Sequence, residues 1–94
     1  MAEQRIDPEA MFKSLNGFEE IAIAEVFRTP AFKLATAAEE GDPVPLMRAL
    51  LFVEVKRGGA KSGEAFRSVM NMRVDDVVAR FQETETEEST EGKG

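Results

Sequence analysis

Signals that start and stop α-helices recur along this chain, and they constrain its fold more than any other feature. Candidate N-caps, each followed by a proline or by an acidic residue within the first turn, begin the predicted segments. These caps are Asp7, Asn16, Thr29 and Ser62. Glycines follow two of the predicted ends, at Gly41 and at Gly58–Gly59, where a left-handed backbone commonly terminates a helix. The pattern predicts short helices over residues 8–14, 17–28, 30–40, 46–57, 63–70 and 73–82.

The most apolar segment runs from Leu46 to Val55 and is interrupted only by Arg48 and Glu54. Its second half, Leu50–Val55, also has the composition of a buried strand, since periodicity does not separate the two structures in short runs. A helix is favoured because the run extends to Arg57 and no second strand of similar quality exists to pair with it. We therefore expect an all-α fold, a small bundle of five or six short helices. The predicted core contains Phe18, Ile21, Leu50, Val53, Phe66, Val77 and Phe81.

The composition excludes most catalytic chemistry. The chain has 94 residues and contains no cysteine, histidine, tryptophan or tyrosine. Nucleophilic triads that depend on histidine are therefore impossible, and a zinc site would need carboxylates alone. The adjacent acidic pairs, such as Asp75 and Asp76, project about 100° apart on a helix and do not share a site. We expect no catalytic residue, no metal ligand and no cofactor, and hence a protein that is not an enzyme.

The negative charge is concentrated at the end of the chain. The net charge is −6, and residues 83–94 contribute −4 of it through five glutamates and one lysine, which leaves −2 for residues 1–82. No apolar residue follows Gln82, so this segment cannot bury apolar surface to offset the conformational entropy that it would lose on ordering. The sequence predicts a flexible N-terminus over residues 1–7, a helical domain over 8–82 and a disordered acidic tail over 83–94.

Binding to nucleic acid or to a membrane is not expected. Four basic residues could form a patch around the glycine pair, but no aromatic residue lies among them in the loop to stack on bases. They are Lys56, Arg57, Lys61 and Arg67. Solvated cations at a helix C-terminus explain them better. No uncharged segment is long enough to cross a bilayer, and the absence of cysteine fits a cytoplasmic setting.

A body of about 75 residues is too small to bury generous apolar surface by itself, so we expect part of this surface to contact another chain. Seven phenylalanines and five methionines supply the excess. Methionine adapts well to irregular partner surfaces. Met70 and Met72 flank a predicted helix break at Asn71, where one of them is expected to be exposed, and for both a core position and an interface position remain open. The predicted partner-binding residues are Met11, Phe12, Met70 and Met72, and a homo-oligomer is possible.

Three phrases, in this order and spacing, resemble the tail assembly chaperones of long-tailed bacteriophages, especially those of actinobacterial hosts. They are Leu15–Ile23 (LNGFEEIAI), Leu46–Val53 (LMRALLFV) and Ala65–Val77 (AFRSVMNMRVDDV). The resemblance covers about residues 15–81, and each phrase is mostly a capped amphipathic helix rather than a chemical signature. The segment from Thr29 to Pro45 matches no pattern of the family.

The resemblance implies a non-enzymatic assembly factor that binds the tape measure protein, and possibly the tail-tube protein. Such proteins keep the tape measure soluble until tail-tube subunits polymerise around it. They act in the host cytoplasm and are absent from the mature virion. The family is often made in two lengths, the longer by a programmed frameshift near the end of the short reading frame.

Two other classes of protein fit the same composition. One is a small structural virion protein, such as a connector or tail completion subunit, which would be present in purified particles. The other is an acidic inhibitor that occupies a basic site on a host protein. That class predicts acidity on the folded surface, whereas most of the negative charge here lies in residues 83–94.

Overall fold

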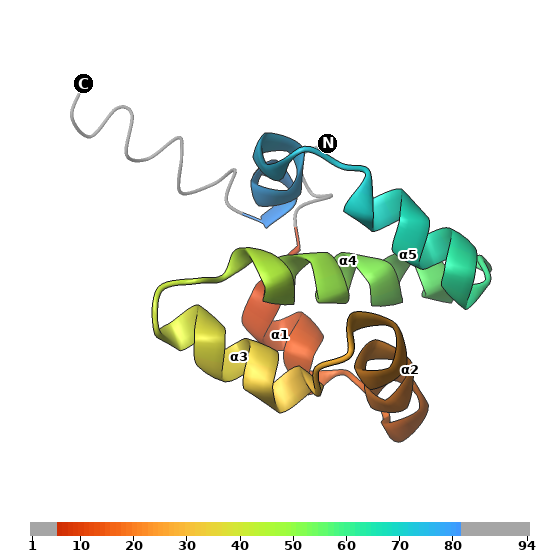
Figure 1. Cartoon of the computed structure of the whole chain (residues 1–94), viewed down its shortest axis with the longest axis horizontal. Helices are drawn as coiled ribbons and strands as arrows, with labels where there is room; N and C mark the ends of the chain where they lie inside the picture. Colours follow the sequence, from red (N-terminus) through yellow and green to blue (C-terminus); the bar gives the residue numbers. More distant parts are fainter. Residues whose placement is uncertain (1–5, 82–94) are drawn as a thin grey trace.

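The computed structural model describes residues 6–81, and over this range it contains helices and no strand (Figure 1). The predicted all-α fold is confirmed, and the predicted choice of helix over strand for Leu50–Val55 is correct. The labelled helices are α1 (Pro8–Lys13), α2 (Gly17–Phe27), α3 (Ala31–Glu39), α4 (Val44–Arg57) and α5 (Ser62–Met70). A last, unlabelled helix occupies residues 74–81.

The first two helices begin as the sequence predicts. The carboxylate of Asp7 accepts a hydrogen bond from the backbone N–H of Glu9 at 3.1 Å. Asn16 and Glu19 form a capping box, in which each side chain accepts a hydrogen bond from the backbone N–H of the other residue. These contacts satisfy amide groups that would otherwise lack partners at the helix starts.

The predicted caps of the third and fifth helices are wrong. The cap positions are Pro30 and Lys61, and neither supplies a side-chain hydrogen bond to its helix. Ser62 lies inside α5, and its hydroxyl accepts a hydrogen bond from Lys56 Nζ at 2.9 Å. The hydroxyl therefore joins α5 to α4 instead of capping α5.

Left-handed backbone conformations mark three of the turns. Gly41 has φ +107° after α3 and Gly59 has φ +112° after α4, as expected for glycine at helix ends. The third position is Arg28, which ends α2 with φ 58°. Among the described residues other than glycine, it alone has a positive φ. A side chain at such a position is strained, because its Cβ approaches the backbone closely.

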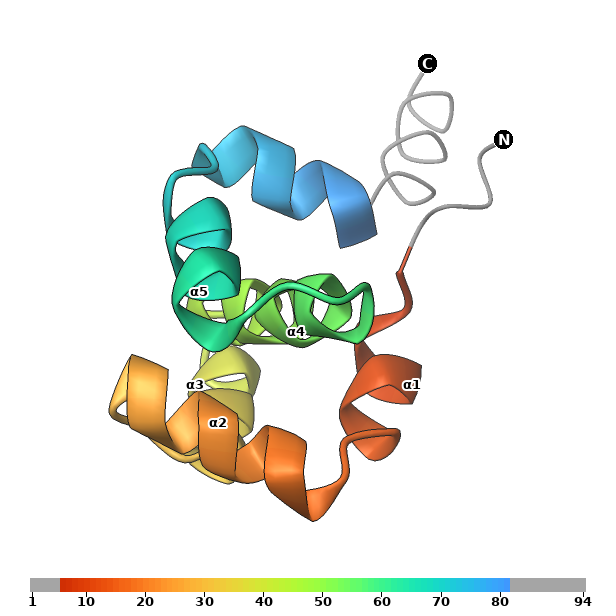
Figure 2. The same ribbon diagram turned by 90° about the vertical axis from the view of Figure 1, so that its right-hand side faces the viewer.

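The molecule is built around α4. This helix contributes seven buried residues, and α1, α2, α3 and α5 all pack against it. Helices α1, α2 and α3 lie on one side of α4, while α5 and the last helix lie on the other (Figures 1 and 2). A helix that is apolar around most of its circumference has to be surrounded in this way.

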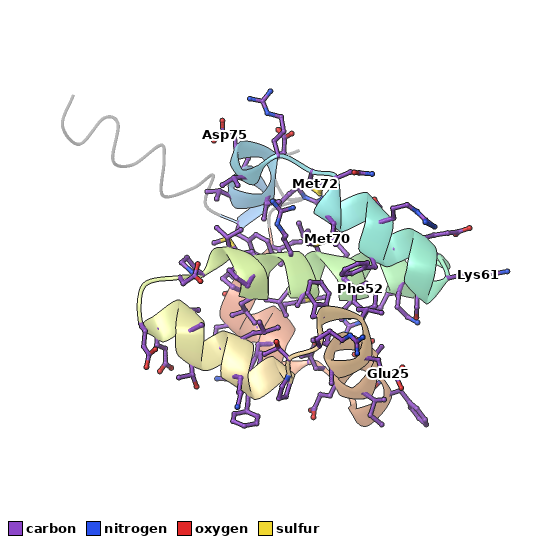
Figure 3. The ribbon with its side chains drawn as sticks, viewed as in Figure 1. Glu25, Phe52, Lys61, Met70, Met72 and Asp75 are labelled. Atoms are coloured by element: carbon purple, nitrogen blue, oxygen red, sulfur yellow. The ribbon has the colours of Figure 1, made fainter. Side chains whose placement is uncertain are left out.

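Four of the seven predicted core residues are buried, namely Leu50, Val53, Val77 and Phe81. Phe66 is half-buried and meets the ring of Phe27 edge-on, with ring centroids 5.1 Å apart. Phe27 also meets Phe52 edge-on at 5.6 Å, and Figure 3 shows Phe52 between α4 and α2.

The prediction is wrong for Phe18 and Ile21, whose exposed fractions are 85% and 58%. Helix α2 is apolar over more than half of its circumference, but its neighbours cover only the side that carries Ile23. Phe18 and Ile21 belong to the uncovered side.

Ile6 belongs to the predicted flexible N-terminus over residues 1–7 and contacts the last helix and the core. The backbone N–H of Ile6 donates to the carbonyl of Arg80 at 2.9 Å, and its side chain packs against the core. Residues 1–5 and 82–94, which include the predicted acidic tail over 83–94, lie outside the described residues. Within residues 6–81, no helix has the length and apolar character needed to cross a membrane.

Candidate partner-binding site

The four residues predicted to bind a partner do not form one surface. Met11 and Phe12 lie on α1, where both are half-buried and pack against the core. Met70 and Met72 lie on the other side of α4 (Figure 3). Met70 is 47% exposed, whereas Met72 is half-buried and packs against the core, so of this pair Met70 is the exposed methionine.

Phe12 has a second role, because it lines an open apolar groove between α1, α2 and α3. The groove has a volume of about 480 Å³. It is lined by the end of α1 and the residue after it, by one face of α2 and by the start of α3. The lining residues are Phe12, Leu15, Gly17, Glu20, Ile21, Ala24, Pro30, Ala31 and Phe32.

Two of the lining residues, Ile21 and Phe32, are exposed, and Phe18 lies about one helical turn from Ile21 on α2; we call these three residues the α2–α3 face. All three side chains are more than half exposed, and Phe32 is 63% exposed. Large side chains concentrated on one face are unusual for a surface with no binding role, whereas single exposed apolar residues are common. The α2–α3 face is therefore the strongest candidate for partner binding among the described residues.

Two small residues are among those that α2 contributes to the groove. Gly17 is the first residue of α2, and a Cβ built at this position would meet no atom within 4 Å. Ala24 lies seven residues later on the same side of the helix. Glu20 and Ile21 lie between them and also line the groove.

The exposed charges on α2 and α3 are mixed in sign. Glu20 is the ionisable residue in the groove lining. Exposed ionisable residues on α2, α3 and their ends comprise four carboxylates and two cations. They are Glu20, Glu25, Glu39 and Glu40, and Arg28 and Lys33.

Besides the core packing, one arginine joins this part of the molecule to α4 by hydrogen bonds. Arg57, the last residue of α4, donates from Nε and Nη2 to the two carboxylate oxygens of Glu19, each at 2.8 Å. Its Nη2 also donates to the carbonyl and the hydroxyl of Ser14, at 3.1 and 3.0 Å. The end of α1 and the start of α2, which together form one end of the groove, are thereby fixed against the end of α4.

This contact changes the protonation of both groups. The hydrogen bonds from Arg57 lower the pKa of the Glu19 carboxyl. The hydrogen bond from the backbone N–H of Asn16 and the positive charges of Arg57 and Lys56 also lower this pKa, whereas desolvation raises it. The same hydrogen bond with Glu19 raises the pKa of Arg57. The Glu19 side chain is largely covered, with 15% of its surface exposed.

Two of the basic residues that were predicted to be solvated cations instead bind other side chains. Arg57 and Lys56 are not free loop cations, because Arg57 binds Glu19 and Lys56 binds Ser62. Arg48, in the middle of the apolar run, donates from Nη1 to the carbonyls of Val69 and Met72, at 2.6 and 2.9 Å. It thus satisfies carbonyl groups at the C-terminal end of α5.

The described residues offer no cluster of three carboxylates that could hold a metal ion. The groove also lacks a nucleophile or a pair of titratable groups, so its chemistry is that of apolar binding.

Sequence reasoning missed the groove because it assigned Phe18 and Ile21 to the core. The signal that was present is the width of the apolar surface of α2, which exceeds what one neighbouring helix can cover. The fold brings Phe12 to this groove and leaves Met70 and Met72 elsewhere. Comparison of the chain with models of protein families, with curated proteins and with solved structures finds no match to any of them.

Proposed function

We propose that this protein is a non-enzymatic tail assembly chaperone that binds the tape measure protein of a long-tailed phage. It keeps the tape measure soluble until tail-tube subunits polymerise around it. The resemblance of Leu15–Ile23, Leu46–Val53 and Ala65–Val77 to this family names the partner. The observation that carries the proposal is the apolar groove beside Phe18, Ile21 and Phe32.

A binding activity fits the physical character of this surface. Burial of apolar area contributes roughly 25 cal/mol per Å², and the exposed side chains of Phe18, Ile21 and Phe32 offer apolar area that the fold leaves uncovered. A long helical client that exposes apolar stripes before assembly needs a cover of this kind. The site of action is then the host cytoplasm, and the mature virion lacks the protein.

Co-expression tests the proposal. The chain and the tape measure protein of the same phage are expressed together, and the soluble yield of the tape measure is measured with and without the chain. We expect a higher soluble yield and co-purification of the two proteins.

A matched pair of variants ties the result to the α2–α3 face. Phe18→Ser removes an exposed apolar side chain from this face, and Val74→Ser removes one from the last helix, where Val74 is 51% exposed. Phe18→Ser is expected to reduce the soluble yield, and Val74→Ser to leave it unchanged. Failure of the wild-type chain to bind the tape measure, together with its presence in purified virions at a fixed stoichiometry, would establish the connector alternative instead.

A further inference from the structure

We infer that α1 is a movable side of the groove. It undocks from α4 as a unit while the other helices stay folded, and Arg57 is the residue that holds it in the docked position. The inference concerns access to the groove, and it does not depend on the identity of the client in the proposed function.

The attachment of α1 to the body is weak. None of its six residues is buried, and the helix packs mainly on α4. Because an isolated helix of this length is not stable in water, α1 depends on its docking. Helix α4, in contrast, contributes seven buried residues to the core. Segments with few buried apolar contacts open at a lower free-energy cost than the core, so α1 is expected to open before α4 does.

The guanidinium of Arg57 supplies the polar contacts that hold the end of α1. Its Nη2 donates to the carbonyl and the hydroxyl of Ser14, and its Nη1 lies 3.7 Å from Met11 Sδ. The Glu19 carboxylate accepts from Nε and Nη2, and this fixes the guanidinium where it reaches Ser14. Removal of the guanidinium therefore frees α1 at this end.

The start of α2 has its own support and stays in place when α1 undocks. Asn16 and Glu19 form the capping box of α2, which involves no atom of α1. The hinge then lies in the connection between Ser14 and Asn16. At the other end of α1, undocking breaks the hydrogen bond from the backbone N–H of Ile6 to the carbonyl of Arg80.

Undocking changes the apolar surface that the protein presents. Phe12 and Leu15 line the groove, and Met11 packs against the core. All three side chains are half-buried in the docked position. Departure of α1 exposes them together with the part of α4 that α1 covers, while the lining from α2 and α3 remains. The undocked protein therefore offers more apolar area for binding, and the contacts of Arg57 set how often this form occurs.

Native-state hydrogen exchange of the wild-type chain tests whether α1 undocks by itself. The backbone amides of Met11, Ser14 and Leu15, which donate hydrogen bonds in and just after α1, are compared by NMR with those of Leu50 and Val53 in α4. After correction for intrinsic rates, the first group should exchange at least about tenfold faster than the second. Its exchange should also depend less on urea, because local opening exposes little surface.

Two variants then identify the residue that holds α1. Arg57→Ala should speed the exchange of the α1 amides about fivefold, since it removes contacts that exist only in the docked position. Arg48→Met is the matched control, because Arg48 also lies on α4 but donates to the carbonyls of Val69 and Met72. This variant weakens the whole fold but loses no contact to α1. It should speed exchange in α4 and leave exchange in α1 unchanged.

A second control covers the case in which Arg48→Met does not fold. Val69→Ala truncates a buried side chain of α5 and should likewise speed exchange in α4 alone. Exchange of the α1 amides at the rate and with the urea dependence of the α4 amides would overturn the inference, because α1 would then leave only when the domain unfolds. Acceleration of α1 by a control variant would mean the same. Unchanged α1 exchange in Arg57→Ala would overturn the assignment of Arg57. None of these measurements involves the tape measure, so the proposed function stands or fails separately by co-expression.

Discussion

At the scale of single residues, Arg57 joins three segments of the chain to α4. Its guanidinium donates hydrogen bonds to Met11 on α1, to Ser14 in the loop after α1 and to Glu19 on α2. Its planar group matches the Glu19 carboxylate in a two-point hydrogen bond, and the same group reaches Ser14. Glu19 also completes the capping box of α2. One pair of residues therefore stabilises a helix start and joins it to the central helix.

Loss of this guanidinium should destabilise the fold measurably. We expect Arg57→Ala to lower the free energy of unfolding by about 1 kcal/mol, since the Arg57 side chain is 39% exposed and solvent weakens the ion pair. Arg57→Lys should recover less than half of the loss, because an ammonium does not reproduce the two-point geometry. Urea unfolding measures both. Lys61→Ala, at an exposed position, is the control and should change stability by less than about 0.5 kcal/mol.

The lowered pKa of Glu19 predicts a pH dependence with a definite sign. A carboxyl whose pKa is lower in the folded state stabilises the protein above its unfolded pKa of about 4.3. That stabilisation is lost as the pH falls through the folded-state pKa. The stability difference between the wild type and Glu19→Gln should therefore be constant near neutral pH and shrink below about pH 4. Urea unfolding at a series of pH values measures it, and a constant difference down to pH 3 would contradict the assignment.

At the scale of helices, α4 and α2 are both apolar around much of their circumference, but the fold treats them differently. Neighbouring helices surround α4 and bury Leu50, Phe52 and Val53 completely. Helix α2 lies at the edge of the molecule, where only the side with Ile23 is covered. The same kind of sequence pattern therefore produces a core in one helix and a candidate binding surface in the other.

This difference predicts opposite results for one kind of substitution. Leu50→Asp should unfold the domain, because an unpaired buried charge costs more than the roughly 5–15 kcal/mol of stability that a small domain has. Met70→Asp, at a 47% exposed position, should leave the helical circular dichroism signal intact. Met72→Asp would be a poorer control than Met70→Asp, because Met72 packs against the core. A folded Leu50→Asp variant would show that α4 is not the centre of the core.

The end of α2 offers a stabilising substitution. Arg28 terminates this helix in the left-handed region, which a side chain adopts at a cost of about 1 kcal/mol. Arg28→Gly should therefore raise the free energy of unfolding, by less than 1 kcal/mol because glycine also gains entropy in the unfolded chain. The midpoint of thermal unfolding measures the change. Gly59→Ala is the reciprocal case, since φ there is +112°, and it should destabilise the protein.

At the scale of the whole molecule, helices lie on two sides of α4 and also meet each other where Phe27 of α2 packs on Phe66 of α5. The candidate site belongs to one of the two sides. Helices α1, α2 and α3 supply the groove, while α5 and the last helix cover the opposite side of α4 (Figure 2). The core, the groove and the ion pairs named above are formed by residues within the described range 6–81.

Removal of the acidic end should therefore leave the fold unchanged. Truncation after Glu83 is expected to alter the free energy of unfolding by less than about 0.5 kcal/mol, since the body already has its core. Thermal or urea unfolding of the two chain lengths measures this. A loss of more than about 2 kcal/mol would mean that the removed residues pack against the body.

Local sequence signals are enough to predict the helices of this protein, whereas the surfaces that these helices bury depend on how they pack together. Caps, prolines and glycines act over a few residues. The sequence alone therefore identifies the capping box at Asn16 and Glu19 and the apolar run of α4. Burial depends on which helices happen to be neighbours. For this reason Phe18 and Ile21 were assigned to the core, and the groove beside them was missed. The contact of Arg57 with Glu19 joins residues 38 positions apart, a separation at which no local pattern specifies a partner and only the packing of α1 and α2 on α4 brings the charges together.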